Sequence, residues 1–273
     1  MKYPKSRRNY YNQKRKEMNI QYVCELYFDK KKSNQQELMK LALQNLGFKP
    51  NIMSIYITMD EMYEEVSYNE DLLFSILFKE DDSGITIIQH LYDENTTNPW
   101  FRLSKIEGDF FSLKWSNKNL DFLLTEIITS FLKMDGFAAG YVFDNKDVWE
   151  QNKEAKENQN LSKDYPGQFK YVCGMQFMAA PLMWFGKSFF EIISKDELLK
   201  FSKAQKLNTD LVEVKLFNIY ESPKKIENRQ TQKSFWTFFE LDKVVNKFEE
   251  ENSIDAVQAL NDFLSKMKSP KKK

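Results

Sequence analysis

Alternating apolar positions open the first regular element of the chain, and they are Ile20, Tyr22, Cys24, Leu26 and Phe28. A period of two predicts a β-strand with one buried face. A helix is expected next, because Asn34 and Glu37 have the spacing of a capping box and Gly47 suits its left-handed end. Residues 53–59 alternate again as a second strand. Strand, helix, strand is the opening of an α/β or α+β layer.

The middle of the chain is rich in predicted strands. Residues 72–78 and 85–91 are short apolar runs around a turn at 81–84, which predicts a hairpin. Residues 100–106 and 110–115 predict another hairpin.

A helix is the clearest element in the sequence, and its apolar positions are Leu120, Leu123, Leu124, Ile127, Ile128 and Phe131. This spacing forms one continuous stripe on a helix face, and Gly136 follows it. The same rules predict the remaining elements: strands at 137–143, 169–178 and 211–219, a helix capped by Ser194 and Glu197, two closing helices over 241–248 and 254–264, and polar loops at 149–163 and 223–231.

These elements predict an α+β protein in which a mixed or antiparallel sheet is packed by about four or five helices. Two successive sheet-plus-helix halves are expected, either separate or sharing one core. The expected division is a basic flexible arm at 1–18, an N-terminal half at 19–136, a C-terminal half at 137–268 and a basic tail at 269–273.

Composition removes several classes of protein. With 273 residues, 8 Gly, 7 Pro and 2 Cys, the chain is neither collagen-like nor a disulfide scaffold. It has no apolar run of about 18 residues that would span a membrane. Its basic, tyrosine-rich N-terminus lacks the apolar core of a signal peptide. We therefore expect a soluble, cytoplasmic protein.

Charge is unevenly distributed although its total is zero. Residues 1–18 carry seven bases and one acid, whereas residues 60–94 carry eleven acids and one base. The plain interpretation of the acidic segment is solvated turns and strand edges, where acids discourage edge pairing. The alternative is a negative face that captures a basic protein such as a nuclease toxin. The expected partner-binding residues are Asp60, Glu61, Glu64, Glu65, Asp81, Asp82, Asp93 and Glu94.

Residues typical of catalysis are scarce. His90 is the only histidine, so sites that need several imidazoles are excluded, and no motif surrounds it. Cys24 and Cys173 lie among apolar residues without CxxC spacing, which is typical of small buried hydrophobic side chains. The glycines form no phosphate-binding loop. We expect no catalytic residue, no bound metal and no cofactor.

Two other functions stay open. Asp144, Asp147 and Glu150 follow a predicted strand at three-residue spacing, so on a helical turn they would share a face and hold Mg²⁺ for a metal-dependent hydrolase. The basic arm carries tyrosines suited to base stacking, which would serve a nucleic-acid accessory protein. The acidic segment disfavours nucleic acid as the main ligand, since it would repel phosphates.

One region resembles part of the bacterial immunity proteins associated with type VI secretion and polymorphic toxins. There a Pro-Gly turn (Pro166-Gly167) leads into an apolar strand, and the aromatic segment Met183–Gly186 follows. A capped helix at 194–206 and a strand at 211–219 come next in the order that such proteins show, and Gly140–Asp144 upstream is similar in character. The resemblance covers about a third of the chain. It implies a non-enzymatic α+β protein that binds and neutralises a cognate toxin, with no catalytic residues.

The sequence therefore predicts a non-enzymatic immunity protein that acts by occlusion and electrostatic capture. A metal-dependent hydrolase and a nucleic-acid accessory protein are the alternatives.

Overall fold

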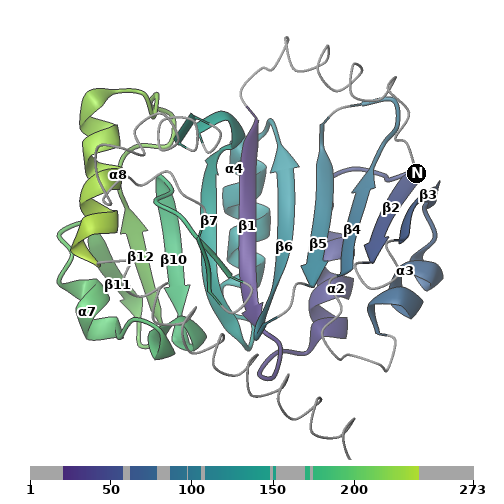
Figure 1. The fold of residues 1–273 in the computed structure, drawn as a ribbon, viewed down its shortest axis with the longest axis horizontal. Helices are drawn as coiled ribbons and strands as arrows, with labels where there is room; N and C mark the ends of the chain where they lie inside the picture. The colour runs from purple at the N-terminus through teal and green to yellow at the C-terminus, as the bar shows by residue number, and fades with distance from the viewer. Residues whose placement is uncertain are drawn as a thin grey trace, which may run out of the picture.

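The computed structural model describes residues 21–57, 62–78, 87–96, 98–105, 108–147, 150–151, 170–172 and 175–239. Its main feature is one ten-stranded sheet with the order β11-β12-β10-β7-β1-β6-β5-β4-β2-β3 (Figure 1). Every neighbouring pair in this sheet is antiparallel. The strands are β1 (Tyr22–Asp29), β2 (Ile52–Ile57), β3 (Met62–Ser67), β4 (Ile87–Tyr92), β5 (Trp100–Lys105), β6 (Phe110–Asn117), β7 (Phe137–Asp144), β10 (Leu182–Gly186), β11 (Ala204–Asn208) and β12 (Leu211–Lys215).

The expected fold class is wrong. The protein is dominated by its sheet, and its helices are short, the longest in the described part of the chain being α8 (Ile226–Phe238) with 13 residues. The two expected halves are joined in one sheet, because β1 pairs with β6 on one side and with β7 on the other. The first described strand therefore lies inside a sheet that continues across residue 136. The expected boundaries at residues 18 and 268 lie outside the described residues.

β1 also differs from its prediction in having both faces buried. Val23, Glu25 and Tyr27 point to one side, which we call the Glu25 face, and Cys24 and Leu26 point to the other, the Cys24 face. Because other elements cover both sides of this central strand, the residues that alternate with its apolar positions are buried as well. Glu25 is only 2% exposed.

Helices cover the Cys24 face, and in Figure 1 α2 and α4 lie behind the sheet. They are α2 (Gln35–Gln44), α3 (Glu70–Leu77) and a continuous helix made of α4 (Leu120–Phe122), a π-helical segment (Leu123–Ile128) and α5 (Thr129–Phe131). The last of these confirms the predicted apolar stripe, since Leu123, Ile127 and Phe131 are buried there. The side chain of Asn34 accepts a hydrogen bond from the Glu37 amide at 3.2 Å, as the predicted cap requires.

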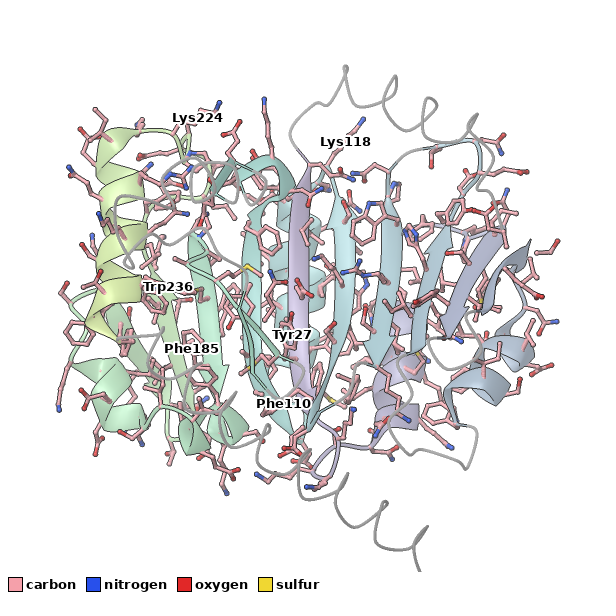
Figure 2. All side chains as sticks on the ribbon, in the orientation of Figure 1. Tyr27, Phe110, Lys118, Phe185, Lys224 and Trp236 are labelled. Carbon is pink, nitrogen blue, oxygen red and sulfur yellow. The ribbon has the colours of Figure 1, made fainter. Side chains whose placement is uncertain are left out.

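The C-terminal strands pack their Glu25 face against a second group of elements: a 3₁₀ helix (Lys187–Glu191), α7 (Lys195–Leu199), α8 and the small hairpin of β8 (Lys170–Val172) and β9 (Met175–Phe177). Phe185 and Trp236, labelled in Figure 2, belong to this core. Stacked and edge-to-face aromatic rings fill it, with Phe185 and Phe189 centred 4.4 Å apart.

Several local predictions are corrected. Residues 70–77 form a helix over most of the segment 72–78 that was expected to be a strand, and residues 226–231 of the expected polar segment 223–231 belong to α8. Both closing helices, at 241–248 and 254–264, lie outside the described residues. None of the described helices combines the length and apolarity that a membrane span requires.

Candidate functional site

The expected acidic residues lie at the β3 end of the sheet, as far as they are described. Glu64 and Glu65 are both exposed on β3, but consecutive strand residues point to opposite faces. Glu64 stands opposite Ile55 of the Cys24 face, and Glu65 stands opposite Ser54 of the Glu25 face. These two carboxylates therefore flank the edge from both sides. Asp60, Glu61, Asp81 and Asp82 lie outside the described residues.

Asn51 brings Asp93 and Glu94 to the same end of the sheet. Its carbonyl accepts from the Tyr68 amide at 2.9 Å, next to the start of α3, and its own amide donates to the Tyr92 carbonyl at 3.2 Å. Its side chain accepts from the Glu94 amide at 2.9 Å and donates to Asp93 Oδ1 at 3.3 Å. The hydrogen bonds of Asn51 therefore hold the turn after β4 next to the β3–α3 connection.

Two further acids join this end although they were not among the expected site residues. Glu70 and Asp71 are exposed in the first turn of α3, after the N-cap Asn69. Carboxylates are favoured there by the positive end of the helix dipole. The capping residue before an apolar run was the signal that could have located them. We call the set Glu64, Glu65, Glu70, Asp71, Asp93 and Glu94 the acidic end.

The acidic end is not neutralised by its own segment. Residues 62–78 contain four acids, Glu64, Glu65, Glu70 and Asp71, and no Lys or Arg. Within the described part of the chain, no ion pair joins Glu64, Glu70 or Asp71 to a basic side chain. The arrangement can therefore attract a cationic surface.

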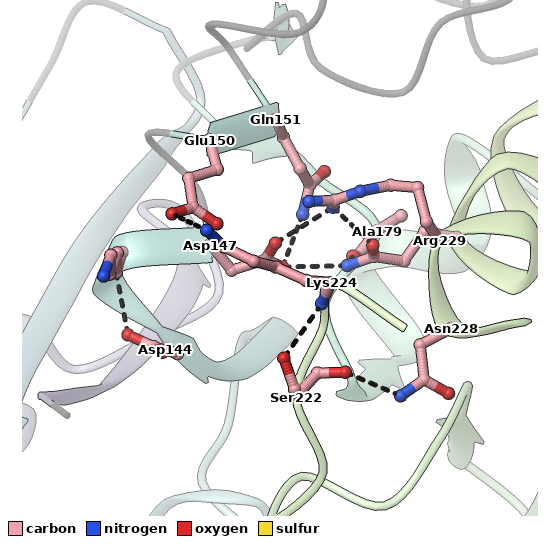
Figure 3. A network of polar contacts seen from close by, with 11 residues as sticks. Asp144, Asp147, Glu150, Gln151, Ala179, Ser222, Lys224, Asn228 and Arg229 are labelled. Carbon is pink, nitrogen blue, oxygen red and sulfur yellow. Dashed lines mark hydrogen bonds and ion pairs between the residues drawn. The ribbon is translucent and has the colours of Figure 1, made fainter. Parts of the chain in front are cut away.

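The three carboxylates of the hydrolase alternative are held by separate partners (Figure 3). Asp147 is 1% exposed, and its oxygens accept from Arg229 at 2.9 Å, Gln151 at 2.7 Å and Gln232 at 2.9 Å. Glu150 pairs with Lys224 at 2.8 Å.

Asp144 instead accepts from the backbone amide of Lys146 at 2.8 Å. Its pKa is raised, first by burial and then by the charges of Asp147 and Glu150. No group of three or more metal-ligating side chains occurs among the described residues. Asp147 therefore joins α8 to the end of β7 through a buried ion pair.

A row of polar side chains crosses the Glu25 face, one from each strand between β3 and β7. Each residue stands directly opposite the next on the neighbouring strand. From the edge inward the cross-strand row is Glu65, Ser54, His90, Arg102, Lys114, Glu25 and Tyr141. Sequence reasoning did not find it, because its members are scattered along the chain.

The inner part of the row contains a satisfied ion pair. Glu25 accepts from Lys114 at 2.8 Å and from the Tyr27 hydroxyl at 2.9 Å. Burial alone would raise the pKa of Glu25, but the charges of Lys114 and Arg102 and the two hydrogen bonds outweigh it and lower that pKa. Glu25 is therefore ionised inside the sheet layer.

Nearer the edge, His90 and Arg102 each have a buried nitrogen without a hydrogen-bond partner among the described residues. These nitrogens are His90 Nε2 and Arg102 Nε, and the same holds for the Tyr141 hydroxyl. Burial first and then the charge of Arg102 lower the pKa of His90 to about 4, against the opposing charge of Glu65. His90 is therefore neutral near pH 7.

The cysteines, the aromatic segment and the basic arm singled out in the sequence either belong to the core or lie outside the described residues. Cys24 is fully buried, and burial raises its thiol pKa well above the ordinary value, so it is not an activated nucleophile. Trp184 and Phe185 lie on the central strand β10 at 4% and 1% exposure, so they build core. Cys173 and the arm at 1–18 lie outside the described residues.

Family models, curated proteins and solved structures were compared with the chain, and none of the three comparisons found a significant match.

Proposed function

We propose that this chain is a cytoplasmic, non-enzymatic immunity protein that neutralises a basic protein toxin by binding it at the acidic end. The observation that carries the proposal is the set of four exposed carboxylates on β3 and α3 without a basic residue among them. The resemblance of residues 165–186 to toxin-immunity proteins supports the class of partner. An inhibitor with this surface occupies the cationic site where a toxin would hold its own anionic substrate.

Electrostatic capture follows from the charge of this end. Complementary charges steer two proteins together and raise the association rate far above that of a neutral pair, from about 10⁵–10⁶ to about 10⁸–10⁹ M⁻¹s⁻¹ at low salt. Salt screens exposed charges over about 10 Å at 0.1 M and about 3 Å at 1 M. Association by this route must therefore slow steeply as salt is added.

The edge position of β3 adds selectivity. β3 pairs only with β2 among the described strands, so its outer backbone groups can accept a partner strand. Glu64 and Glu65 repel a second copy of this edge and favour a strand with basic side chains. The same two residues thus oppose self-association and support toxin docking.

The test mixes the full chain with the protein toxin encoded beside its gene and measures association by surface plasmon resonance. We expect a tight complex whose association rate falls with salt. The variant E64Q/E65Q/E70Q/D71N should associate at least about tenfold more slowly at low salt, with a flatter salt dependence.

A matched control removes four exposed acids from other elements: Glu37, Glu126, Asp210 and Glu227. It changes the net charge equally and should keep most of the wild-type rate. If both variants associated with the toxin equally slowly, net charge alone would explain the lower rate, and the acidic end would be refuted as the docking surface. Absence of any complex with the toxin would refute the function.

A further inference from the structure

The outer part of the cross-strand row has the features of an anion site. His90 on β4 stands directly opposite Arg102 on β5. Opposed residues of antiparallel strands have Cα atoms about 4.5–5.5 Å apart and side chains on the same face. Both side chains are only half-buried, yet His90 Nε2 and Arg102 Nε are individually buried. Two nitrogens therefore lie near one another, out of water and without acceptors.

Arg102 is not accounted for by the neighbouring ion pair. Glu25 already accepts from Lys114 and from Tyr27. No ion pair or hydrogen bond in the described structure ends on the Arg102 guanidinium. Arginine stays charged at every physiological pH, and a buried charge is normally paired. The charge of Arg102 acts on Glu25 without a direct contact, so the Nε–H of the guanidinium has no acceptor among the described residues.

Aromatic rings flank the same place. The imidazole of His90 lies 5.2 Å from the Tyr92 ring and 5.2 Å from the Trp100 ring, measured between centroids. Trp100 is perpendicular to the imidazole at 87°. These rings stand next to Arg102 on the Glu25 face and provide apolar surface for the body of a small ligand.

We propose that Arg102 and His90 form a binding site for the oxyanion of a small molecule, a carboxylate or a phosphate, with Trp100 beside its apolar part. An oxygen of the ligand accepts from Arg102 Nε–H and from the Nε2–H tautomer of neutral His90. Charge-assisted bonds from a guanidinium are the strong ones in such sites. The site lies on the Glu25 face and shares with the acidic end only Glu65, which stands at the outer end of the same row.

The single histidine makes the test direct, because its ring gives one assigned NMR signal. Inorganic phosphate and sodium benzoate are titrated separately into the full chain at constant ionic strength, with chloride as the reference salt. We expect a saturable shift of the His90 signal with at least one of the two probes. A response to phosphate alone assigns a phosphate ligand, a response to benzoate alone assigns a carboxylate, and a response to both assigns their common oxyanion.

Variants separate a ligand site from a structural charge. R102M should weaken binding about tenfold or more, and R102K should weaken it less, since it keeps the charge and loses the planar fork. K118M removes an exposed base elsewhere and should bind as the wild type does. The variant E64Q/E70Q/D71N, which keeps Glu65, should also keep the site.

Circular dichroism checks that each variant is folded, and R102K serves if R102M is not. The proposal is overturned if neither probe gives a saturable shift in the wild type, or if a folded Arg102 variant binds the responding probe as tightly as K118M does.

Discussion

The titration of His90 is the sharpest physical consequence of the cross-strand row. In the folded chain burial lowers its pKa from the ordinary 6.5 to about 4, assisted by the charge of Arg102. Each tenfold change in a protonation equilibrium corresponds to about 1.4 kcal/mol. The difference between the folded and unfolded pKa of His90 therefore contributes at most ~3.5 kcal/mol to the pH dependence of stability, an upper bound because part of the ring is exposed.

The sign follows from proton binding. Between pH 6.5 and about 4 the unfolded chain protonates this histidine while the folded chain does not. The unfolded state then binds more protons, so stability falls as the pH is lowered through that window and levels off below it. Carboxylates titrate in the same range, so the useful quantity is the difference between wild type and H90Q. The stability of wild type relative to H90Q should fall by up to ~3 kcal/mol from pH 7 to pH 4 in urea unfolding.

NMR measures the cause separately from the stability. R102Q should raise the His90 pKa, because it removes a neighbouring positive charge, and E65Q should lower it, because it removes the charge that favours the imidazolium. K118Q, an exposed change outside the row, should leave it unchanged. A wild-type His90 pKa near 6.5, or shifts of the same sign in R102Q and E65Q, would refute the described surroundings of the ring.

Three further predictions concern stability and reactivity. D147N should lower the free energy of unfolding by about 3–5 kcal/mol, since it removes the buried negative charge that pairs with Arg229, whereas E150Q should cost less than about 1 kcal/mol; urea unfolding compares them, and equal losses would contradict the buried ion pair. G186A should lower the free energy of unfolding by about 1–3 kcal/mol or more, because the added Cβ would lie 2.4 Å from a backbone oxygen. G140A should lower it less, since its added Cβ meets a movable side chain at 2.9 Å. Thermal unfolding that ranked the two variants in reverse would count against this packing. With the other cysteine replaced by serine, Cys24 should react with a thiol reagent only after denaturation, and rapid reaction of the native protein would show that the thiol is accessible.

Local signals predicted the elements whose buried side is purely apolar. The leucine and isoleucine stripe over residues 120–131 and the capping serine at 194 both gave the right element, since each depends only on neighbours in sequence. α8 was missed for a physical reason. Its buried side includes Asn228 and Gln232, and the Gln232 amide donates to Asp147 and to the Ala179 carbonyl. A helix that buries amides shows no apolar stripe, so its sequence resembles a polar loop.

The apolar run at 72–78 was misread because periodicity cannot separate a short buried helix from a strand. Asn69 decides the question, as its side chain accepts from the Leu72 amide at 2.9 Å and caps the helix. The error in fold class has a similar origin. Counting elements along the chain suggested two halves, but the place of β1 between β6 and β7 depends on long-range pairing that no local pattern encodes.

The two candidate sites differ in how far sequence could reveal them, and the reason is geometric. Glu70 and Asp71 lie within a few residues of Glu64 and Glu65, so a count of charges found their segment although it could not tell which faces they occupy. The cross-strand row takes one residue from each of several strands that are distant in sequence, and only the register brings them into line. A shift of one residue between β6 and either of its neighbours would turn Lys114 to the other face and place Leu113 or Trp115 opposite Arg102 or Glu25. The polar row and the apolar Cys24 face therefore specify the same register, because sliding a strand would bury an unpaired charge and expose a core side chain at once.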